Sequence, residues 1–483
     1  MASRATTRSE TQLTNVTTRL DRVPFGRVHL TITMALGIVW LLDAFEVNII
    51  GSVIGTIDNV FNATALQGSL IISIWLIGIM VGAFFFGYLA DRFGRRKLFM
   101  LTLALYASCT IIAALSVNLW MFIAFRFLTA IGVGAEYSAV NTAISEFIPA
   151  RVRGRTNAAV MGFWNFGALF SAILSLILIN VLPDNVGWRL AFAFGAIAAV
   201  LIVWLRRAVP ESPRWLVMRG RVDDAEQVVS GIEERVAREK GMPVAQLPAA
   251  AVAPVSQYHA KPFFAQVGEL LRRYAGRLAL GCLLDLSEAF GYYGIFAFLP
   301  LVVLPAVNIP PNQVPWFFIA GDIGAVFGGL LVIFVLDRFG RKVSVPAFYT
   351  LAAITAVLMG PAALTHSGLA VLIAFIIANF FATSAWISAY PTFTEIFPTH
   401  LRGTGVGLSI AVGRIGAATA APLLVFVATQ TPLGIAGGFV LLGVLWLVGA
   451  VAMVPWYFRG VEGAATPLEQ MVPVATGGEV PAA

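Results

Sequence analysis

Two pairs of carboxylates with the same spacing stand inside long apolar stretches of this sequence. Asp43 and Glu46 are three residues apart in one stretch, and Asp285 and Glu288 are three apart in another. On a helix this spacing puts each pair on one face. Two carboxylates removed from water together do not easily both stay ionised, so we expect one member of each pair to bind and release a proton near physiological pH. This is the chemistry required of a proton carrier.

The segments that hold these groups are long and apolar. Apolar residues make up 59% of the 483-residue chain and charged residues only 12%, and the mean hydropathy is +0.85. In a typical soluble domain about a quarter of the residues are charged. Stretches that approach the roughly 20 residues needed to cross hydrocarbon occur at 30–40, 66–90, 98–116, 119–145, 157–182, 188–205, 278–304, 315–336, 344–364, 368–390, 404–428 and 433–457. We therefore expect an all-α membrane protein with twelve transmembrane helices.

The 32 Lys and Arg residues indicate how these spans are oriented. All but Arg126, Arg189 and Arg414 fall in the terminal segments or in alternate loops. The loops on the opposite side hold none, and they lie near 54–65, 304–314, 364–368 and 428–433. The positive-inside rule then predicts a multi-pass protein of a cell (inner) membrane with both termini in the cytoplasm. Because the basic residues are dispersed over short loops, no nucleic acid is expected as a partner.

The N-terminal segment and the cysteines exclude other classes of protein. Residues 1–29 are polar, rich in Thr and Arg and without an apolar core, so we expect a disordered tail rather than a cleavable signal peptide. Cys109 and Cys282 both lie inside apolar spans. Packing roles are expected for them, since two such residues provide neither a disulfide framework nor a metal cluster.

Three motifs occur twice in the same order. LLDAFE at 41–46 parallels LLDLSE at 283–288, DRFGRR at 91–96 parallels DRFGRK at 337–342, and SEFIPARVRG at 145–154 parallels TEIFPTHLRG at 394–403. The offsets of 242, 246 and 249 residues are nearly constant, which indicates duplication of a six-helix unit. The expected organisation is a cytoplasmic tail at 1–29, a six-helix bundle at 30–205, a cytoplasmic central loop with short helices at 206–276, a second bundle at 277–457 and a cytoplasmic tail at 458–483.

The chain resembles the major facilitator superfamily, in the branch of sugar porters and metabolite:proton symporters. The resemblance covers nearly all of the chain and implies a monomeric secondary transporter whose two six-helix halves rock around a midplane site. The last matching segment, at 460–469, departs from the Glu-Thr-Lys-Gly that is usual in the family. The motifs that carry the resemblance are GYLADRFGRRK at 87–97, RFLTAIGVG at 126–134, PESPR at 210–214, YPTFTEIFPTHLRGTG at 390–405 and GVEGAATPLE at 460–469.

The resemblance assigns a gating role to charges at the cytoplasmic ends of the helices. It implies that these residues form charge networks that lock the outward-facing state, one network in each half. The alternative is that they are ordinary positive-inside anchors, although the acids have no topological reason to be there. The first network is Asp91 and Arg92 with Glu146 and Arg153, and the second is Asp337 and Arg338 with Glu395 and Arg402.

The resemblance also selects a proton site. A carboxylate inside the membrane costs roughly 2.5–3.5 kcal/mol on insertion scales, so Glu136 and Asp322 need an explanation as well as the two pairs. In sugar porters an Arg at the position of Arg126 pairs with an acid at the position of Asp43. We therefore expect Asp43 and Arg126 to couple proton entry to helix rocking, with Glu46 and Glu136 as further proton sites. The alternatives are a neutralised pair without function and, for Glu136, a water-exposed position. Replacement of Asp43 by Asn is expected to abolish uphill uptake and to spare exchange.

Candidates for substrate binding lie on several spans. Arg414 is expected either to bind a substrate carboxylate bidentately or to neutralise Asp285 or Glu288, and Asn165 is the nearest polar candidate in the fifth span. Most aromatic residues in such a chain face lipid or core, but those near cavity-facing helix centres suit a flat or apolar ligand. They are Trp40, Phe45, Trp164, Phe290, Tyr292, Tyr293 and Trp386. Of these we select Tyr292, Tyr293 and Trp386.

These residues favour proton-coupled symport of a small organic carboxylate, such as nicotinate or a benzoate-like acid. Sugar:proton symport is an alternative, although LLDLSEAFGYYG at 283–294 lacks the paired Gln of sugar porters. Organic-cation transport is another, since the intramembrane acids outnumber the bases, and a non-transporting receptor is a third. The chain shows no zincin, nucleophile-elbow or Walker pattern, so we expect no enzyme. The expected partners are a small-molecule substrate, a proton and membrane lipid, with the proton gradient in place of any cofactor.

Overall fold

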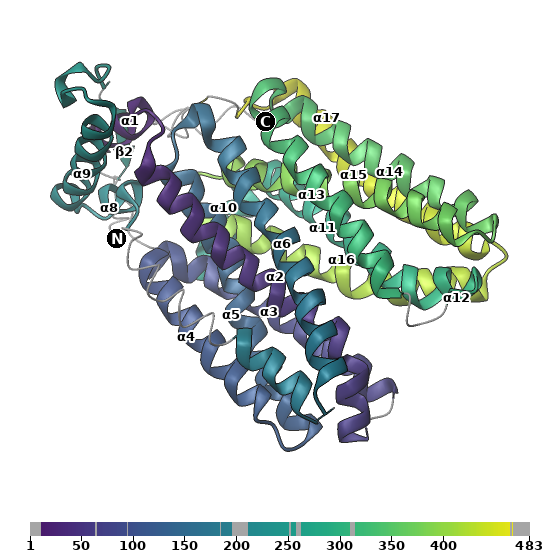
Figure 1. Cartoon of the computed structure of the whole chain (residues 1–483). Helices are drawn as coiled ribbons and strands as arrows, with labels where there is room; N and C mark the ends of the chain where they lie inside the picture. The colour runs from purple at the N-terminus through teal and green to yellow at the C-terminus, as the bar shows by residue number, and fades with distance from the viewer. Residues whose placement is uncertain are drawn as a thin grey trace, which may run out of the picture.

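The computed structural model describes residues 11–62, 65–93, 95–183, 185–195, 211–250, 253–256, 262–309, 314–463 and 466. Its long helices form two groups that follow one another in the chain (Figure 1). The first half contains α2 (Arg27–Phe61), α3 (Ala65–Phe93), α4 (Arg95–Ala114), α5 (Leu119–Phe147), α6 (Arg153–Val181) and a helical stretch at 185–195. The second half contains α11 (Ala275–Phe298), α13 (Val314–Phe339), α14 (Arg341–Leu364), α15 (Gly368–Ile396), α16 (Arg402–Gln430) and α17 (Gly434–Arg459).

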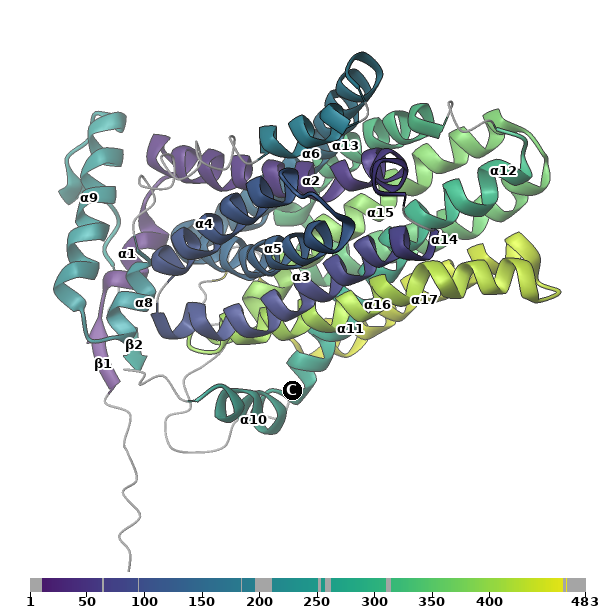
Figure 2. The same ribbon diagram turned by 90° about the horizontal axis from the view of Figure 1, so that it is seen from below.

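Short elements occupy the connections between the long helices. They are β1 (Thr11–Thr14), α1 (Val16–Arg22), η1 (Ala150–Val152), α8 (Pro213–Met218), α9 (Val222–Lys240), η2 (Val244–Gln246), β2 (Ala253–Ser256), α10 (Phe263–Arg273), η3 (Leu299–Val303) and α12 (Leu304–Ala306). In two views at right angles, α1, α8 and α9 lie together at one end of the long helices (Figure 1, Figure 2). We call this the basic end, because the loops rich in Lys and Arg are expected on this side of the membrane.

The order of the long helices follows the twelve expected spans. Within the described residues, seven segments are long and apolar enough to cross a membrane by length and composition: Arg27–Ile49, Ala150–Leu178, Trp316–Phe339, Arg341–Leu364, Gly368–Ile396, Arg402–Gln430 and Gly434–Arg459. Three shorter apolar helices are Ile74–Phe86, Met100–Ala114 and Leu119–Gly134. The predicted fold class, a helical membrane protein built from two six-helix repeats, is confirmed.

Close helix contacts repeat between the two halves. A Cβ atom at Gly82 of α3 would overlap the backbone carbonyl oxygen of Ile131 in α5, and one at Gly328 of α13 would overlap that of Phe380 in α15. The two glycines are 246 residues apart and the two carbonyls 249 residues apart. Small residues let membrane helices approach until their backbones touch, and the duplicated motifs place this contact at the same point of each half.

The first span is longer than expected. α2 continues to Phe61 through most of the stretch that the sequence analysis assigned to an external loop at 54–65. Ile57 is fully buried in an apolar cluster with Trp188 and Phe192, which keeps this part of the helix packed. The helix ends where Asn62 takes a left-handed backbone conformation with φ of 49°, which Asn adopts more readily than most residues.

The expectation of a disordered N-terminal tail is wrong for residues 11–29. β1 pairs with β2 as an antiparallel strand, with Thr11 opposite Ser256, so this otherwise helical protein carries a two-stranded sheet. Arg19 and Arg22 of α1 each form an ion pair with Glu233 of α9, both at 2.6 Å. The segment is ordered by contacts with residues more than 200 positions further along the chain. Composition alone does not reveal such contacts.

Candidate functional site

Two buried ion pairs join the halves at the basic end. Arg153, at the start of α6, donates from Nε to Oε1 of Glu395 near the end of α15 at 2.8 Å. Arg402, at the start of α16, donates from Nη1 to Oε1 of Glu146 near the end of α5 at 3.2 Å. All four side chains are at most 2% exposed. We call these two pairs the gate, since the basic ends of the halves cannot separate without breaking both.

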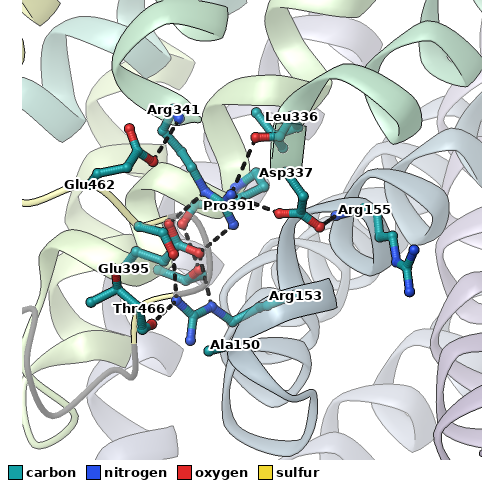
Figure 3. A network of polar contacts seen from close by, with 12 residues as sticks. Ala150, Arg153, Arg155, Leu336, Asp337, Arg341, Pro391, Glu395, Glu462 and Thr466 are labelled. Atoms are coloured by element: carbon teal, nitrogen blue, oxygen red, sulfur yellow. Dashed lines mark hydrogen bonds and ion pairs between the residues drawn. The ribbon is translucent and has the colours of Figure 1, made fainter. Parts of the chain in front are cut away.

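The first pair belongs to a larger network (Figure 3). Arg341 of α14 donates to both carboxylate oxygens of Glu395, at 2.8 and 2.9 Å, and its Nη1 donates to Asp337 Oδ1 at 2.7 Å. Asp337 Oδ2 accepts a hydrogen bond from the backbone N–H of Arg155 in the first half at 2.7 Å. Glu395 and Asp337 therefore both connect the second half to the first half.

The segment after α17 adds a further link between the halves. Glu462 accepts hydrogen bonds from the backbone N–H groups of Arg341 and Lys342, at 2.8 and 3.1 Å (Figure 3). These N–H groups lie at the N-terminus of α14 and have no acceptor within the helix, so a carboxylate is favoured there. The backbone oxygens of Gly463 and Thr466 accept from Nη2 of Arg153 at 3.2 and 3.0 Å. The segment thus contacts both halves at the gate.

The residues Glu146, Arg153, Glu395 and Arg402, for which a gating role is predicted, lie together at the basic end, but their partners differ from the expected ones. One network inside each half was expected, whereas each Arg of the gate contacts the Glu of the opposite half. Arg341 rather than Arg338 contacts Glu395, because Arg338 is exposed and its guanidinium carbon lies 5.6 Å from the ring centre of Phe339. Arg92 is likewise exposed and donates to the hydroxyl of Tyr88 at 3.1 Å. The side chain of Asp91 lies outside the described residues.

A buried ion pair lies inside the first half. Arg126 of α5 donates from Nη1 to Oε1 of Glu46 in α2, and both side chains are at most 1% exposed. Thr110 of α4 lies 3.5 Å from the same carboxylate oxygen. The guanidinium carbon lies 5.4 Å from the ring of Trp75 and 5.0 Å from that of Phe192. Aromatic faces attract a cation, so the site is built to hold a charged arginine away from water.

This pair corrects the partner that we expected for Arg126. The expected partner was Asp43, but the ion pair that the structure shows for Arg126 is with Glu46. Asp43 is also buried and lies one helical turn earlier on the same face of α2. Sequence spacing put both acids on this face and could not distinguish which of them the guanidinium reaches. The side chain of Glu136, the other predicted proton site, lies outside the described residues.

A second buried charge cluster lies inside the second half. Asp285 and Glu288 of α11 are at most 2% exposed, and Arg414 of the neighbouring helix α16 is 3% exposed. α16 passes so close that a Cβ atom at Gly413 would overlap Oδ2 of Asp285. The guanidinium carbon of Arg414 lies 5.4 Å from the ring centre of Tyr293. Two buried acids and one buried arginine thus lie on adjoining helices next to an aromatic ring.

An aromatic cluster connects the halves between these charge groups. Trp164 of α6 donates from Nε1 to the hydroxyl of Tyr292 in α11 at 3.3 Å, and its ring centre lies 5.4 Å from that of Trp386 in α15. Trp40 of α2 contacts both Trp164, at 5.6 Å, and Tyr390 of α15, at 6.2 Å. Tyr292 also lies 5.8 Å from Trp386. We call these five residues the aromatic cluster.

Other predicted contact residues lie in different places. Asn165 of α6 donates to the backbone oxygen of Ala325 in α13 at 3.2 Å, so it too contacts the opposite half. Phe45 packs against Phe170 and Phe194 within the first half. Phe290 is buried in the main apolar core. The structure therefore brings Asn165, but neither of these two phenylalanines, to the contact between the halves.

Comparison with known proteins agrees with this arrangement of two joined helical halves. The family described as "Sugar (and other) transporter" matches residues 22–474. The chain belongs to this family. As a member of the major facilitator superfamily, it is a multi-pass membrane transporter, as the sequence motifs indicated.

Proteins with similar sequences include a niacin transporter, NiaP, from Acinetobacter baylyi. It is 32% identical over 411 residues, which cover 85% of this chain and 90% of the relative. The putative metabolite transport protein YyaJ of Bacillus subtilis is 29% identical over 91% of this chain and 94% of its own length. A solved structure of the proton:xylose symporter XylE, bound to 6-bromo-6-deoxy-D-glucose, matches with a TM-score of 0.75 and 20% identity, covering 92% of this chain and 98% of that one. The last comparison supports the fold alone.

Three residues of the site escaped the sequence analysis of this family member. Arg341 and Tyr390 both stand inside motifs that the analysis quoted, DRFGRK and YPTFTEIFPTHLRGTG. Glu462 stands in the terminal segment that departs from the usual pattern of the family. The position of Arg341 could have identified it. Arg341 follows Gly340, which interrupts the helix with φ of 79°, so Arg341 is the first residue of a new helix beside the acids of the gate.

Proposed function

We propose that this transporter is a proton-coupled symporter of small, preferably aromatic, carboxylates. The observation that carries the proposal is the position of Arg414, which lies deep in the second half beside Asp285, Glu288 and the ring of Tyr293. A guanidinium binds a carboxylate through two parallel hydrogen bonds, and the tyrosine ring offers a face for a flat ligand. The niacin transporter among its relatives supports this class, because niacin is a small aromatic carboxylate.

The driving force in this proposal is a proton that binds at the Glu46–Arg126 pair. Protonation of Glu46 would remove the charge that neutralises Arg126, and an unpaired buried charge is strongly destabilising. The helices that carry the two residues, α2 and α5, would then move relative to each other. Asp43, on the same face of α2, is the nearest second acceptor for the proton. Coupling needs no bound cofactor, because the proton gradient supplies the free energy.

The gate gives the proposal its alternating access. With Arg153–Glu395 and Arg402–Glu146 formed, the basic end is closed. Substrate release there requires both pairs to break while the halves rock apart. If the basic end faces the cytoplasm of a cell with an inner membrane, as the charge distribution predicts, the described conformation precedes uptake. We propose that a monomer performs this cycle.

Organic-cation transport is the second candidate. Among the described residues inside the helices, the buried acids Asp43, Glu46, Asp285, Glu288 and Asp322 outnumber the buried arginines Arg126 and Arg414 away from the gate. An excess of buried carboxylates would favour a cationic substrate. Sugar:proton symport receives weaker support, since the resemblance to the xylose symporter is one of fold.

Uptake into proteoliposomes separates these candidates. Labelled nicotinate, benzoate, glucose and choline are offered with and without an inward proton gradient, to the wild type and to the variants Arg414→Ala and Arg189→Ala. Arg189 is the matched control, because it contacts backbone oxygens near the opposite end of the first half. The proposal expects gradient-stimulated uptake of a carboxylate that Arg414→Ala abolishes. Uptake of glucose or choline alone would assign the chain to another substrate class.

A further inference from the structure

Asp322 of α13 is a carboxylate without a described partner in the middle of the protein. Its side chain is 6% exposed. Among the residues that the structure describes, no hydrogen bond, ion pair or nearby cation reaches it. A carboxylate is costly to keep in such a place, which points to a ligand that supplies the missing partner.

The helix face that carries Asp322 points to the contact between the halves. Ala325 and Gly329 follow at spacings of three and seven residues, which puts all three on one face of α13. Asn165 of the first half donates to the backbone oxygen of Ala325 at 3.2 Å and lies 3.6 Å from the Cβ position of Gly329. Asp322 is one turn away from that contact, on the side away from the basic end. It therefore faces the region that alternating access must open and close.

A chain of aromatic rings begins one helical turn from Asp322. Phe318, one turn before Asp322 on α13, stacks on Phe296 of α11 with ring centres 5.4 Å apart and an interplanar angle of 18°. Phe296 in turn lies 4.8 Å from Tyr292. The ring of Tyr292 also lies 5.8 Å from that of Trp386. Aromatic faces next to a carboxylate form a binding site for a positively charged nitrogen.

Opposite charges lie on either side of two adjacent tyrosines. Tyr292 and Tyr293 have ring centres 5.6 Å apart. Tyr292 packs on Phe296, which stacks on Phe318 one turn from Asp322, whereas Tyr293 lies 5.4 Å from the guanidinium carbon of Arg414. A ligand lying along these two rings would meet an acid at one end and an arginine at the other. This arrangement is complementary to a molecule with a carboxylate and a basic nitrogen.

We propose that Asp322 binds a positively charged nitrogen of the substrate, so that the transporter selects small carboxylates that also carry a basic nitrogen. This inference rests on the proposed function and extends it from one recognised group to two. Arg414 holds the carboxylate, Asp322 holds the nitrogen, and the tyrosine rings hold the body of the ligand between them. A simple aromatic acid of the same shape satisfies only Arg414.

Nicotinate and benzoate provide a matched pair of probes, because they differ only in the ring nitrogen. This nitrogen is uncharged in neutral solution, so it takes up a proton from the medium on the side of entry when it pairs with the Asp322 carboxylate. Their specificity ratio, taken from uptake into proteoliposomes under an inward proton gradient, is measured for the wild type, Asp322→Ala and Asp322→Glu. Charge-assisted hydrogen bonds contribute roughly 1.5–3 kcal/mol, which is about tenfold to a hundredfold in affinity. The wild type is expected to prefer nicotinate by about tenfold or more, and Asp322→Ala to reduce the ratio to about one. Asp322→Glu is expected to keep part of the preference.

Thermal stability separates binding from a structural role. Removal of a buried charge without a partner is expected to leave the melting temperature of Asp322→Ala unchanged or raised, whereas a structural acid would lower it. Asp223→Asn, on the exposed surface of α9, is the control and is expected to change neither the ratio nor the stability.

The outcomes distinguish this inference from the proposed function. Equal transport of benzoate and nicotinate by the wild type, or an unchanged ratio in Asp322→Ala, would overturn the role of Asp322 and leave carboxylate symport standing. If Asp322→Ala failed to fold, its loss of stability would contradict the inference directly. Failure of the wild type to transport either acid would instead reject the proposed function itself.

Discussion

Arg153 in the first half and Glu395 in the second form a buried ion pair, with Nε and Oε1 2.8 Å apart. Arg402 follows Arg153 by 249 positions, and Glu146 precedes Glu395 by the same number. Arg402 and Glu146 form the second pair of the gate. Duplication of one Arg and one Glu thus produced two reciprocal contacts across the pseudo-symmetry axis. Each pair links the start of one helix to the end of a helix in the other half, so the gate closes only when both halves adopt one relative orientation.

Glu395→Gln is expected to open the basic end. Loss of one partner of a buried pair costs about 3–5 kcal/mol, and Glu395 also binds Arg341, so the closed population should fall by a hundredfold or more relative to the open one. Spin labels at Lys97→Cys and Arg338→Cys, both exposed at the basic end of different halves, would report a longer distance. Arg155→Ala is the matched control, because Arg155 contacts Asp337 through its backbone N–H. An unchanged distance distribution in Glu395→Gln would show that the pair does not hold the gate closed.

Glu46→Gln is expected to uncouple transport from the proton gradient. The neutral side chain cannot release a proton, so uphill accumulation of substrate should disappear while exchange of internal for external substrate continues. One pH unit corresponds to about 1.4 kcal/mol, or about tenfold accumulation for one proton per carboxylate in the wild type. Asp43→Asn is the comparison. Loss of accumulation in Asp43→Asn but not in Glu46→Gln would return the coupling role to Asp43.

The N-terminal segment is expected to detach from α9 at low pH. Burial alone would raise the pKa of Glu233, but hydrogen bonds from Arg19 and Arg22 outweigh it and hold this pKa below its ordinary value. A depressed pKa stabilises the folded contact above the ordinary glutamate value of about 4.3, and this stabilisation is lost as the pH falls through the lower folded-state value. Neutralising Glu233 by mutation should have the same effect at neutral pH.

Cleavage by trypsin after Arg19 and Arg22 measures that detachment. Glu233→Gln is expected to speed cleavage at pH 7 by at least tenfold, because both arginines lose a buried partner. Glu234→Gln removes the same charge from the exposed neighbouring position and should leave the rate unchanged. Equal rates in the two variants would mean that Glu233 does not fasten the segment.

Gly82→Ala and Gly328→Ala are expected to destabilise the protein, each by several kcal/mol. The added methyl group has no room at either position, because each glycine touches a backbone carbonyl of the neighbouring helix, and strain in a packed contact costs about 1–3 kcal/mol or more. Gly231→Ala in α9 is the control, since open space surrounds that position, and it should add about 0.5–1 kcal/mol of helix stability. Thermal unfolding in detergent compares the three variants, and an unchanged melting temperature for Gly328→Ala would contradict the close helix contact.

The sequence predicted the architecture and most residues of the gate because both depend on local signals. Span length, the distribution of arginines and the repeated motifs indicated two six-helix halves. The pairing of the gate depended on how the halves meet, which local sequence does not contain, so Arg153 was expected to interact within its own half. The same limit explains Arg126: spacing placed Asp43 and Glu46 on one face of α2, but the choice between them depends on a shift of one helical turn.

The N-terminal segment shows a different limit. β1 pairs with β2, and α1 pairs with Glu233, through contacts that link positions more than 200 residues apart. The polar composition of residues 11–29 resembles that of a disordered tail, and only the partner segments make it ordered. Asp322 was recognised as an unusual intramembrane acid, but its significance came from the aromatic rings that α11 and α13 bring around it.

Proton-driven accumulation of labelled nicotinate in proteoliposomes measures carboxylate symport itself. An inward gradient of one pH unit is imposed, and initial rates are compared with those of protein-free vesicles, Arg414→Ala and vesicles treated with a protonophore. The wild type is expected to take up nicotinate several times faster than protein-free vesicles, with a matching influx of protons, and the protonophore or Arg414→Ala is expected to remove the excess. Uptake that ignores the gradient, or no uptake above protein-free vesicles, would contradict proton-coupled carboxylate symport.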